Sequence, residues 1–118
     1  MTTYDDPRFH PGNMPSGFSA LMETERESLV AWIKKWLRPA SKVNHRHTSY
    51  GLKHIFQHFE GGFYTTNGQF KGAMEAAGFL PDDPDDLNHH YRITERSTGA
   101  AGKASMEYQR RRAQEASR

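Results

Sequence analysis

Residues 49–79 have the sequence SYGLKHIFQHFEGGFYTTNGQFKGAMEAAGF, and this stretch decides the fold of the chain. It contains two segments in which apolar residues recur at i, i+3, i+4 and i+7, the spacing that gives a helix one apolar face. These residues are Leu52, Ile55, Phe56 and Phe59 in the first segment, and Phe70, Ala73, Met74 and Ala77 in the second. The stretch therefore predicts two short helices joined by a tight turn.

Polar residues and glycines mark the ends of the two predicted helices. Ser49 stands at the N-cap position of the first, and Thr66 and Gln69 form the capping-box pattern of the second. Gly61 and Gly78 follow the two apolar segments and suit the left-handed conformation that ends many helices. The short connection favours a helix-turn-helix-like unit. An ordinary helical hairpin with no nucleic-acid role is the alternative.

Two short amphipathic helices cannot bury their apolar faces alone, so they need a third element. The sequence supplies it between Thr24, which forms a capping box with Glu27, and Pro39, which ends a helix. The apolar residues of this segment again follow helical spacing. We expect the three helices to share one core, formed by Trp32, Trp36, Leu52, Phe56, Phe59, Phe70 and Met74.

The remaining segments complete a mainly α fold, a small three-helix domain over residues 16–95. Residues 1–15 hold three prolines and predict an extended N-terminal arm. Residues 88–94, NHHYRIT, predict a short β-strand or wing that pairs with residues 62–65 or with another chain. Residues 41–48 are interpreted as a basic linker. Residues 96–118 predict a flexible basic tail, so both termini are expected to be flexible.

Composition narrows the class of protein. The chain has 118 residues, 35% of them hydrophobic, and a mean hydropathy of −0.92, which fits one small domain. The absence of cysteine excludes a disulfide scaffold, a thiol nucleophile and cysteine-ligated zinc. No apolar run approaches the ~20 residues that span a bilayer, and the acidic start does not resemble a signal peptide. We expect a cytoplasmic protein.

The charges are unevenly distributed along the chain. Seven lysines and arginines but only one carboxylate lie between Lys34 and Lys71, whereas residues 82–86 contain four aspartates. Such asymmetry is typical of nucleic-acid surfaces, although runs of charge are also common on plain solvated faces. If the protein binds DNA or RNA, we expect base contacts from the start of the second helix and phosphate contacts from the residues before it. The predicted base contacts are Asn67, Gln69 and Lys71, and the predicted phosphate contacts are Lys42, Arg46 and Lys53.

The histidines give weak support for an enzyme or a metal site. His54 and His58 are four residues apart and would share a helix face, but a closed zinc site needs two further ligands. We therefore expect no metal, no cofactor and no catalytic residues. A histidine- or metal-dependent nuclease using His45 or His47 stays open as a second alternative.

The blocks HTSYGLKH and FYTTNGQFKGAMEAAGF, followed by Asn88 before a strand, resemble a group of small, uncharacterised proteins of phages, plasmids and other mobile elements. The resemblance covers residues 48–93. It implies that the protein belongs to a mobile element, but it implies no particular mechanism. It implies an accessory protein, either a regulator or an anti-defence protein. The first hypothesis is a non-catalytic regulator that binds nucleic acid through the helix-turn-helix-like unit. The alternative is an anti-CRISPR or related inhibitor that binds a host defence effector directly.

Overall fold

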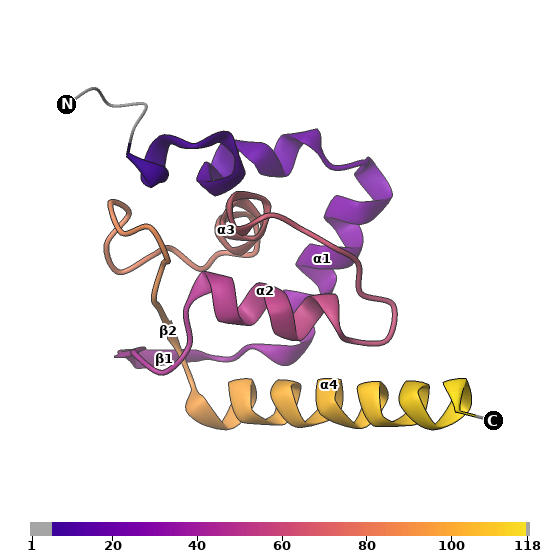
Figure 1. Ribbon diagram of the computed structural model, residues 1–118. Helices are drawn as coiled ribbons and strands as arrows, with labels where there is room; N and C mark the ends of the chain where they lie inside the picture. Colours follow the sequence, from indigo (N-terminus) through magenta and orange to yellow (C-terminus); the bar gives the residue numbers. More distant parts are fainter. Residues whose placement is uncertain (1–5, 118) are drawn as a thin grey trace.

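The structure, a computed structural model, describes residues 6–117 and is mainly helical with one small antiparallel sheet (Figure 1), as the sequence predicts. The elements in chain order are the 3-10 helices η2 (Pro7–Phe9), η3 (Pro11–Asn13) and η4 (Pro15–Ala20), helix α1 (Glu23–Trp36), strand β1 (Pro39–Asn44), helices α2 (Ser49–Gln57) and α3 (Asn67–Ala76), strand β2 (Tyr91–Ile93) and helix α4 (Glu95–Ala116). Within the described residues, no helix combines the length and the apolar character needed to cross a membrane.

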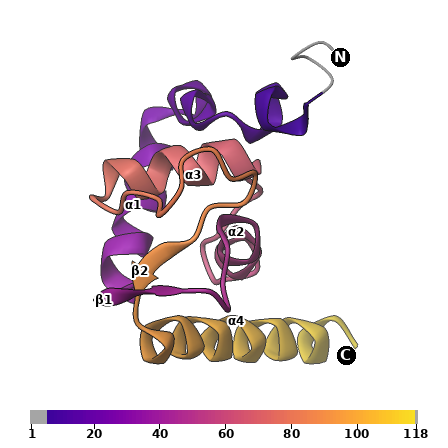
Figure 2. The same ribbon diagram turned by 90° about the vertical axis from the view of Figure 1, so that its left-hand side faces the viewer.

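Helix α3 lies between the N-terminal 3-10 helices on one side and α1 and α2 on the other (Figures 1 and 2). Two glycines allow this close packing. A Cβ atom on Gly68 would lie 2.3 Å from the carbonyl oxygen of Met14, and one on Gly72 would lie 2.3 Å from that of Pro15. Residues 6–15 are therefore not the extended arm that the prolines predict, because they form short turns packed directly on α3. Residues 1–5 lie outside the described residues.

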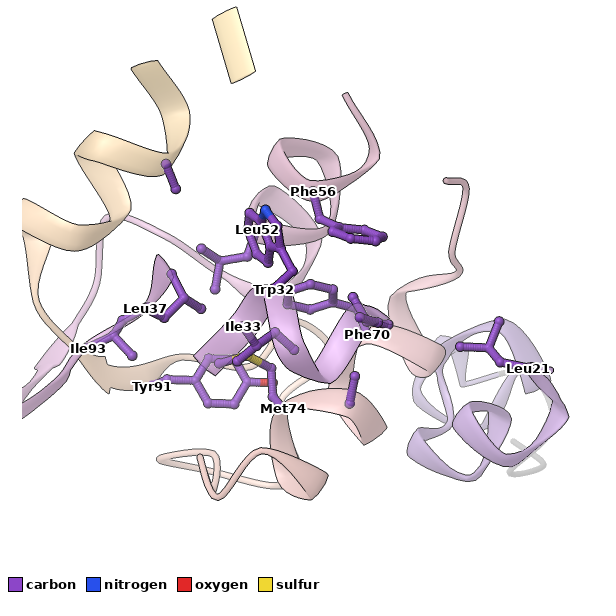
Figure 3. Packing of buried hydrophobic residues seen from close by; sticks show 13 residues of the cluster. Leu21, Trp32, Ile33, Leu37, Leu52, Phe56, Phe70, Met74, Tyr91 and Ile93 are labelled. Carbon is purple, nitrogen blue, oxygen red and sulfur yellow. The ribbon is translucent and has the colours of Figure 1, made fainter. Parts of the chain in front are cut away.

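The predicted core is confirmed and centres on one indole ring (Figure 3). Trp32 makes edge-to-face contacts with Phe56, Phe59 and Phe70, with ring centroids 5.3, 5.5 and 6.5 Å apart. Such pairs add to the free energy gained from burying their area. Trp36 and Phe59 are only partly buried and cover the edge of this cluster. The core also includes Tyr91 and Ile93 from β2 and Ala101 from α4.

The partner of the predicted strand is β1, and the prediction of residues 62–65 or another chain is wrong. Strands β1 and β2 are antiparallel, with Pro39 opposite Ile93, Asn44 opposite Tyr91 and an irregularity between these pairs. The segment interpreted as a linker is thus largely a strand. It carries polar and basic side chains because most of it is exposed, so it lacks the apolar alternation that signals a strand.

Helix α4 replaces the flexible tail predicted from residue 96. The hydroxyl oxygen of Thr94 accepts a hydrogen bond from the Ser97 N–H at 3.1 Å and caps the helix. The buried face of α4 consists of small residues, Ser97, Thr98, Ala101 and Ser105. Small polar residues and glycine resemble a linker in sequence, but here they let α4 pack closely against α1 and α2.

The other predicted helix starts shift by one or two residues. The N-cap of α2 is Thr48, whose hydroxyl oxygen accepts from the Gly51 N–H at 3.3 Å, and Ser49 is the first helical residue. Helix α1 begins after Met22, whose N–H donates to the Glu25 carboxylate at 2.9 Å. The capping box of α3 is confirmed.

The two tryptophans allow a matched test of the core. We expect Trp32→Ala to lower the free energy of unfolding by about 3–5 kcal/mol, because it truncates a buried aromatic side chain. Trp36→Ala should have a clearly smaller effect, since its ring is only partly buried. Urea unfolding followed by circular dichroism measures both. Equal losses in the two variants would contradict the described packing.

Candidate nucleic-acid interface

Asn67, predicted to contact a base, is instead the centre of a buried hydrogen-bond network. Its side-chain oxygen accepts from the Ser49 hydroxyl at 2.8 Å, and that hydroxyl oxygen accepts from the His89 N–H at 3.0 Å. The Asn67 amide nitrogen lies 3.1–3.2 Å from three acceptors, Asn13 Oδ1, the Leu87 carbonyl and Asn88 Oδ1. The residue is 6% exposed. Asn67 therefore joins η3, α2, α3 and the segment before β2.

The other two predicted base contacts are also occupied within the protein. The Lys71 ammonium is buried and donates to the Asn13 carbonyl at 3.1 Å, and burial lowers its pKa. Gln69 completes the capping box, accepting from the Thr66 N–H at 2.9 Å. Because η3 and η4 cover the start of α3, this helix cannot enter a DNA groove in the arrangement described here. The predicted reading of bases by this helix is corrected on that ground.

The predicted phosphate contacts divide into exposed and buried residues. Lys42 is exposed on β1, and Arg46 is exposed just after it, with its guanidinium 3.9 Å from the Glu95 carboxylate. Lys53 is 4% exposed, and its ammonium donates to Gln57 Oε1 at 3.3 Å. Desolvation lowers the pKa of Lys53. Only Lys42 and Arg46 are thus freely available to a phosphate.

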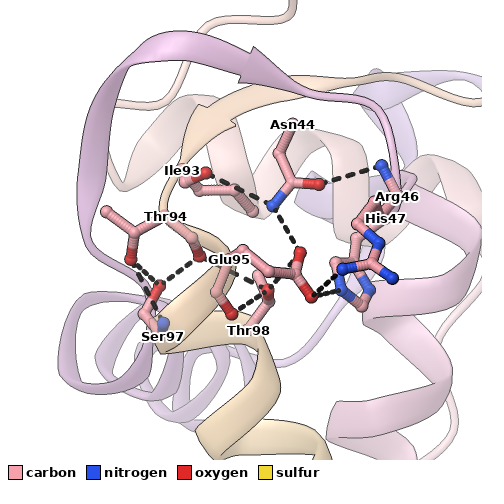
Figure 4. A network of polar contacts seen from close by, with 8 residues as sticks. All are labelled: Asn44, Arg46, His47, Ile93, Thr94, Glu95, Ser97 and Thr98. Carbon is pink, nitrogen blue, oxygen red and sulfur yellow. Dashed lines mark hydrogen bonds and ion pairs between the residues drawn. The ribbon is translucent and has the colours of Figure 1, made fainter.

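A polar network beside Arg46 holds the sheet against the start of α4 (Figure 4). The Glu95 carboxylate accepts from His47 Nε2 and from Asn44 Nδ2, both at 3.1 Å. Asn44 is buried, and its Nδ2 also donates to the Ile93 carbonyl at 3.3 Å. His47 is therefore bonded within a structural network. A cavity of about 320 Å³ adjoins the network and is lined by Lys42, Asn44, Arg46 and Glu95 among other residues.

Exposed cations lie on the end of α1, on strand β1 and along helix α4, elements that together form the lower side of the molecule in Figure 1. We call this surface the basic pole. Ten exposed lysines and arginines on it face four exposed carboxylates, which gives a net charge of +6. The cations are Lys34, Lys35, Arg38, Lys42, Arg46, Arg96, Lys103, Arg110, Arg111 and Arg112, and the carboxylates are Glu60, Glu95, Glu107 and Glu115. Of these ten cations, only Lys42 and Arg46 are predicted from the sequence as site residues, and five of the others lie on α4, which the sequence predicts to be a flexible tail.

Acidic residues gather away from the basic pole. The first turn of α1 contains Glu23 and Glu25, and the loop before β2 contains exposed Asp83, Asp85 and Asp86. No carboxylate occurs between Ser28 and Phe59. The molecule therefore has a strong charge asymmetry, which can orient it toward a polyanion.

Helix α2 presents the histidine pair that could have held a metal. The rings of His54 and His58 are nearly parallel, with centroids 6.4 Å apart. Within residues 6–117, no three histidine, aspartate or glutamate side chains are grouped as metal ligands. Comparison with known protein families, curated proteins and solved structures found no match to this chain.

The network around Asn67 can be tested by one isosteric change. We expect Asn67→Asp to lower the free energy of unfolding by about 3 kcal/mol or more, because a carboxylate would face three oxygen acceptors in a buried site. Gln69→Ala is the control and should lose up to about 1 kcal/mol, the value of a capping interaction. Urea unfolding measures both. A fully stable Asn67→Asp protein would mean that this amide is not the structural centre.

The lowered pKa values of two side chains, Glu95 and His89, predict how stability depends on pH. The hydrogen bond from His47 lowers the pKa of Glu95, and burial lowers the pKa of His89. In both cases the unfolded chain binds the proton more readily than the folded chain. The free energy of unfolding therefore falls as the pH drops below about 6.5, the ordinary pKa of histidine. It falls again below about 4.3, the ordinary pKa of glutamate. Glu95→Gln should be less stable than the parent at pH 7, and the difference should close near pH ~3. Thermal melts across this range measure it. A constant difference would contradict the role given to the carboxylate.

Proposed function

We propose that this protein is a non-catalytic nucleic-acid-binding protein of a mobile element, and that it binds through the basic pole. The observation that carries the proposal is the presence of ten exposed cations on α1, β1, α4 and the residues that flank them, against four carboxylates. Lysine and arginine side chains on such a surface displace the counterions of a phosphate backbone, which supplies affinity that does not depend on sequence.

The three arginines near the end of α4, Arg110 to Arg112, are better placed to contact a polyanion than to form ion pairs within the protein. Arg111 lies 3.5 Å from Glu60, but both side chains are well exposed, so this ion pair contributes little stability and is easily exchanged. Arg111 and Arg112 both lie beside the ring of Tyr108, at 5.7 and 5.9 Å from its centroid. Tyr108 therefore adjoins both guanidinium groups, of which Arg111 faces the cavity beside Trp36 and Arg112 the cavity beside His58.

The alternative, an anti-defence protein that binds a host effector such as a CRISPR complex, is favoured by a different observation. The loop of residues 82–86 is exposed, and of its four aspartates only Asp82 forms an ion pair among the described residues, with Arg92 at 3.3 Å. A compact group of carboxylates can imitate phosphates toward a basic protein surface. This function would use the acidic loop and leave the basic pole free.

Binding to a labelled oligonucleotide at two or more salt concentrations tests the proposal. We expect the parent to bind, with an affinity that falls steeply with salt, and Arg110→Gln/Arg111→Gln/Arg112→Gln to flatten the log–log salt slope by about one to two units. Asp83→Asn/Asp85→Asn/Asp86→Asn is the control of opposite charge and should not weaken binding.

A parent protein with no affinity for DNA or RNA at low salt would overturn this function. The acidic loop would then become the leading surface, and the same aspartate variant should abolish capture of the purified effector complex.

A further inference from the structure

A row of aromatic side chains crosses the exposed face of α2 next to the basic pole. Tyr50, His54 and His58 are spaced at i, i+4 and i+8 and therefore lie along one line of the helix surface. The Tyr50 and His54 ring centroids are 4.6 Å apart, and those of His54 and His58 are 6.4 Å apart. Tyr64, from the segment between α2 and α3, stands beside this row. We call these four residues the aromatic ridge.

The two tyrosines of the aromatic ridge are exposed although they are large and partly apolar. Tyr50 is 50% exposed and Tyr64 is 66% exposed. Lys53 lies between them, with its ammonium 5.6 Å from the centroid of Tyr50 and 4.7 Å from that of Tyr64. A cation over an aromatic ring is attracted to it, so Lys53 holds both rings in place while leaving much of their surface in solvent.

The aromatic ridge continues into the basic pole. His58 and Gln57 from α2 line a cavity of about 360 Å³ together with Tyr108 and Arg112 from α4. Arg112 donates to the Tyr108 hydroxyl oxygen at 3.1 Å. The aromatic ridge therefore adjoins the arginines of α4 at this cavity.

We propose that the aromatic ridge is a stacking platform for unpaired bases, so that the protein prefers single-stranded over double-stranded nucleic acid. The inference rests on the proposed function and specifies its ligand. Aromatic rings bind bases of any sequence through their π faces, and a basic groove alongside follows the backbone. In a duplex the base faces are already stacked on one another and cannot reach exposed rings. The eight residue steps from Tyr50 to His58 rise about 12 Å along the helix axis, a length that suits a few nucleotides.

The chemistry of the aromatic ridge agrees with this ligand. Burial and the nearby Lys53 lower the pKa of His54, which keeps its imidazole neutral at pH 7 and able to stack. The cation of Lys53 lies beneath the rings and is almost fully buried, so it places a positive charge behind the rings without being a direct phosphate contact. The carboxylate nearest along the chain is Glu60, which is already paired with Arg111.

The test compares a single-stranded oligonucleotide with the duplex of the same sequence, using fluorescence anisotropy on the full chain. We expect Tyr50→Ala and Tyr64→Ala each to weaken binding of the single strand about five- to hundredfold, the range for losing one base stack. Binding of the duplex and the salt slope should stay unchanged, because no phosphate contact is removed. Tyr50→Phe and Tyr64→Phe keep the rings and should bind like the parent.

A second control tests whether the loss of any exposed aromatic ring weakens binding, or only the loss of a ring in the aromatic ridge. Phe9 is 51% exposed and lies in η2, far along the chain from the aromatic ridge, so Phe9→Ala should not change binding of either ligand. Thermal melts identify any variant that has lost its fold.

If folded Tyr50→Ala and Tyr64→Ala proteins bind the single strand as the parent does, the stacking platform is overturned and the proposed function stands. Variants that bind the single strand and the duplex with equally weakened affinity also overturn the stacking platform. A parent that binds neither ligand at low salt overturns the proposed function itself.

Discussion

A single buried amide, the side chain of Asn67, constrains four parts of the chain at once. Its oxygen and nitrogen both have partners, and the hydroxyl of Ser49 passes the network on to the backbone of His89. A buried polar network stabilises a fold only when its members are satisfied, and it then excludes other arrangements. Gly68, the next residue, is what allows the N-terminal turns to come close enough to take part. The position of α3 inside the domain follows from these two neighbouring residues.

That position decides which surfaces are left for function. The start of α3 is covered, so its polar residues bond within the protein. Most of the cations of the basic pole lie on β1 and α4, on the side of the molecule away from the N-terminal turns. Lys71 illustrates the difference from the basic pole, because its ammonium is directed to the Asn13 carbonyl inside the protein. The small-residue face of α4 then places Arg96 near the sheet and the last arginines, at the other end of the helix, beside the ends of α1 and α2. Charge separation in this molecule is therefore a consequence of how the helices pack.

The sequence predicts those parts of the fold in which apolar residues repeat with the helical period. Three helices and the core around Trp32 follow from that pattern. Strand β1 and helix α4 do not, because a mostly exposed strand has no apolar alternation and a helix packed through Ser97, Thr98 and Ala101 resembles a linker. The candidate site was harder to predict still. Asn67 and Lys71 occupy positions that contact bases in a helix-turn-helix. Nothing in the sequence next to them indicates that residues 6–15 cover them. Ser49, Asn67 and Asn88 meet in one network, so the fold alone accounts for these three polar residues.

The two buried lysines show why the aromatic ridge is a reasonable place for a ligand. Removing an ammonium group from water is unfavourable by several kcal/mol unless other groups compensate for the lost hydration. Lys71 gains a carbonyl acceptor within a network that holds the domain together. Lys53 has only a 3.3 Å hydrogen bond to Gln57 and two tyrosine rings, and among the described residues it has no carboxylate partner. A leucine or methionine at this position would cover the same area without the desolvation penalty, so stability alone does not account for a lysine here. An anionic strand lying across Tyr50 and Tyr64 would supply the missing negative charge and would be attracted by both the cation and the rings.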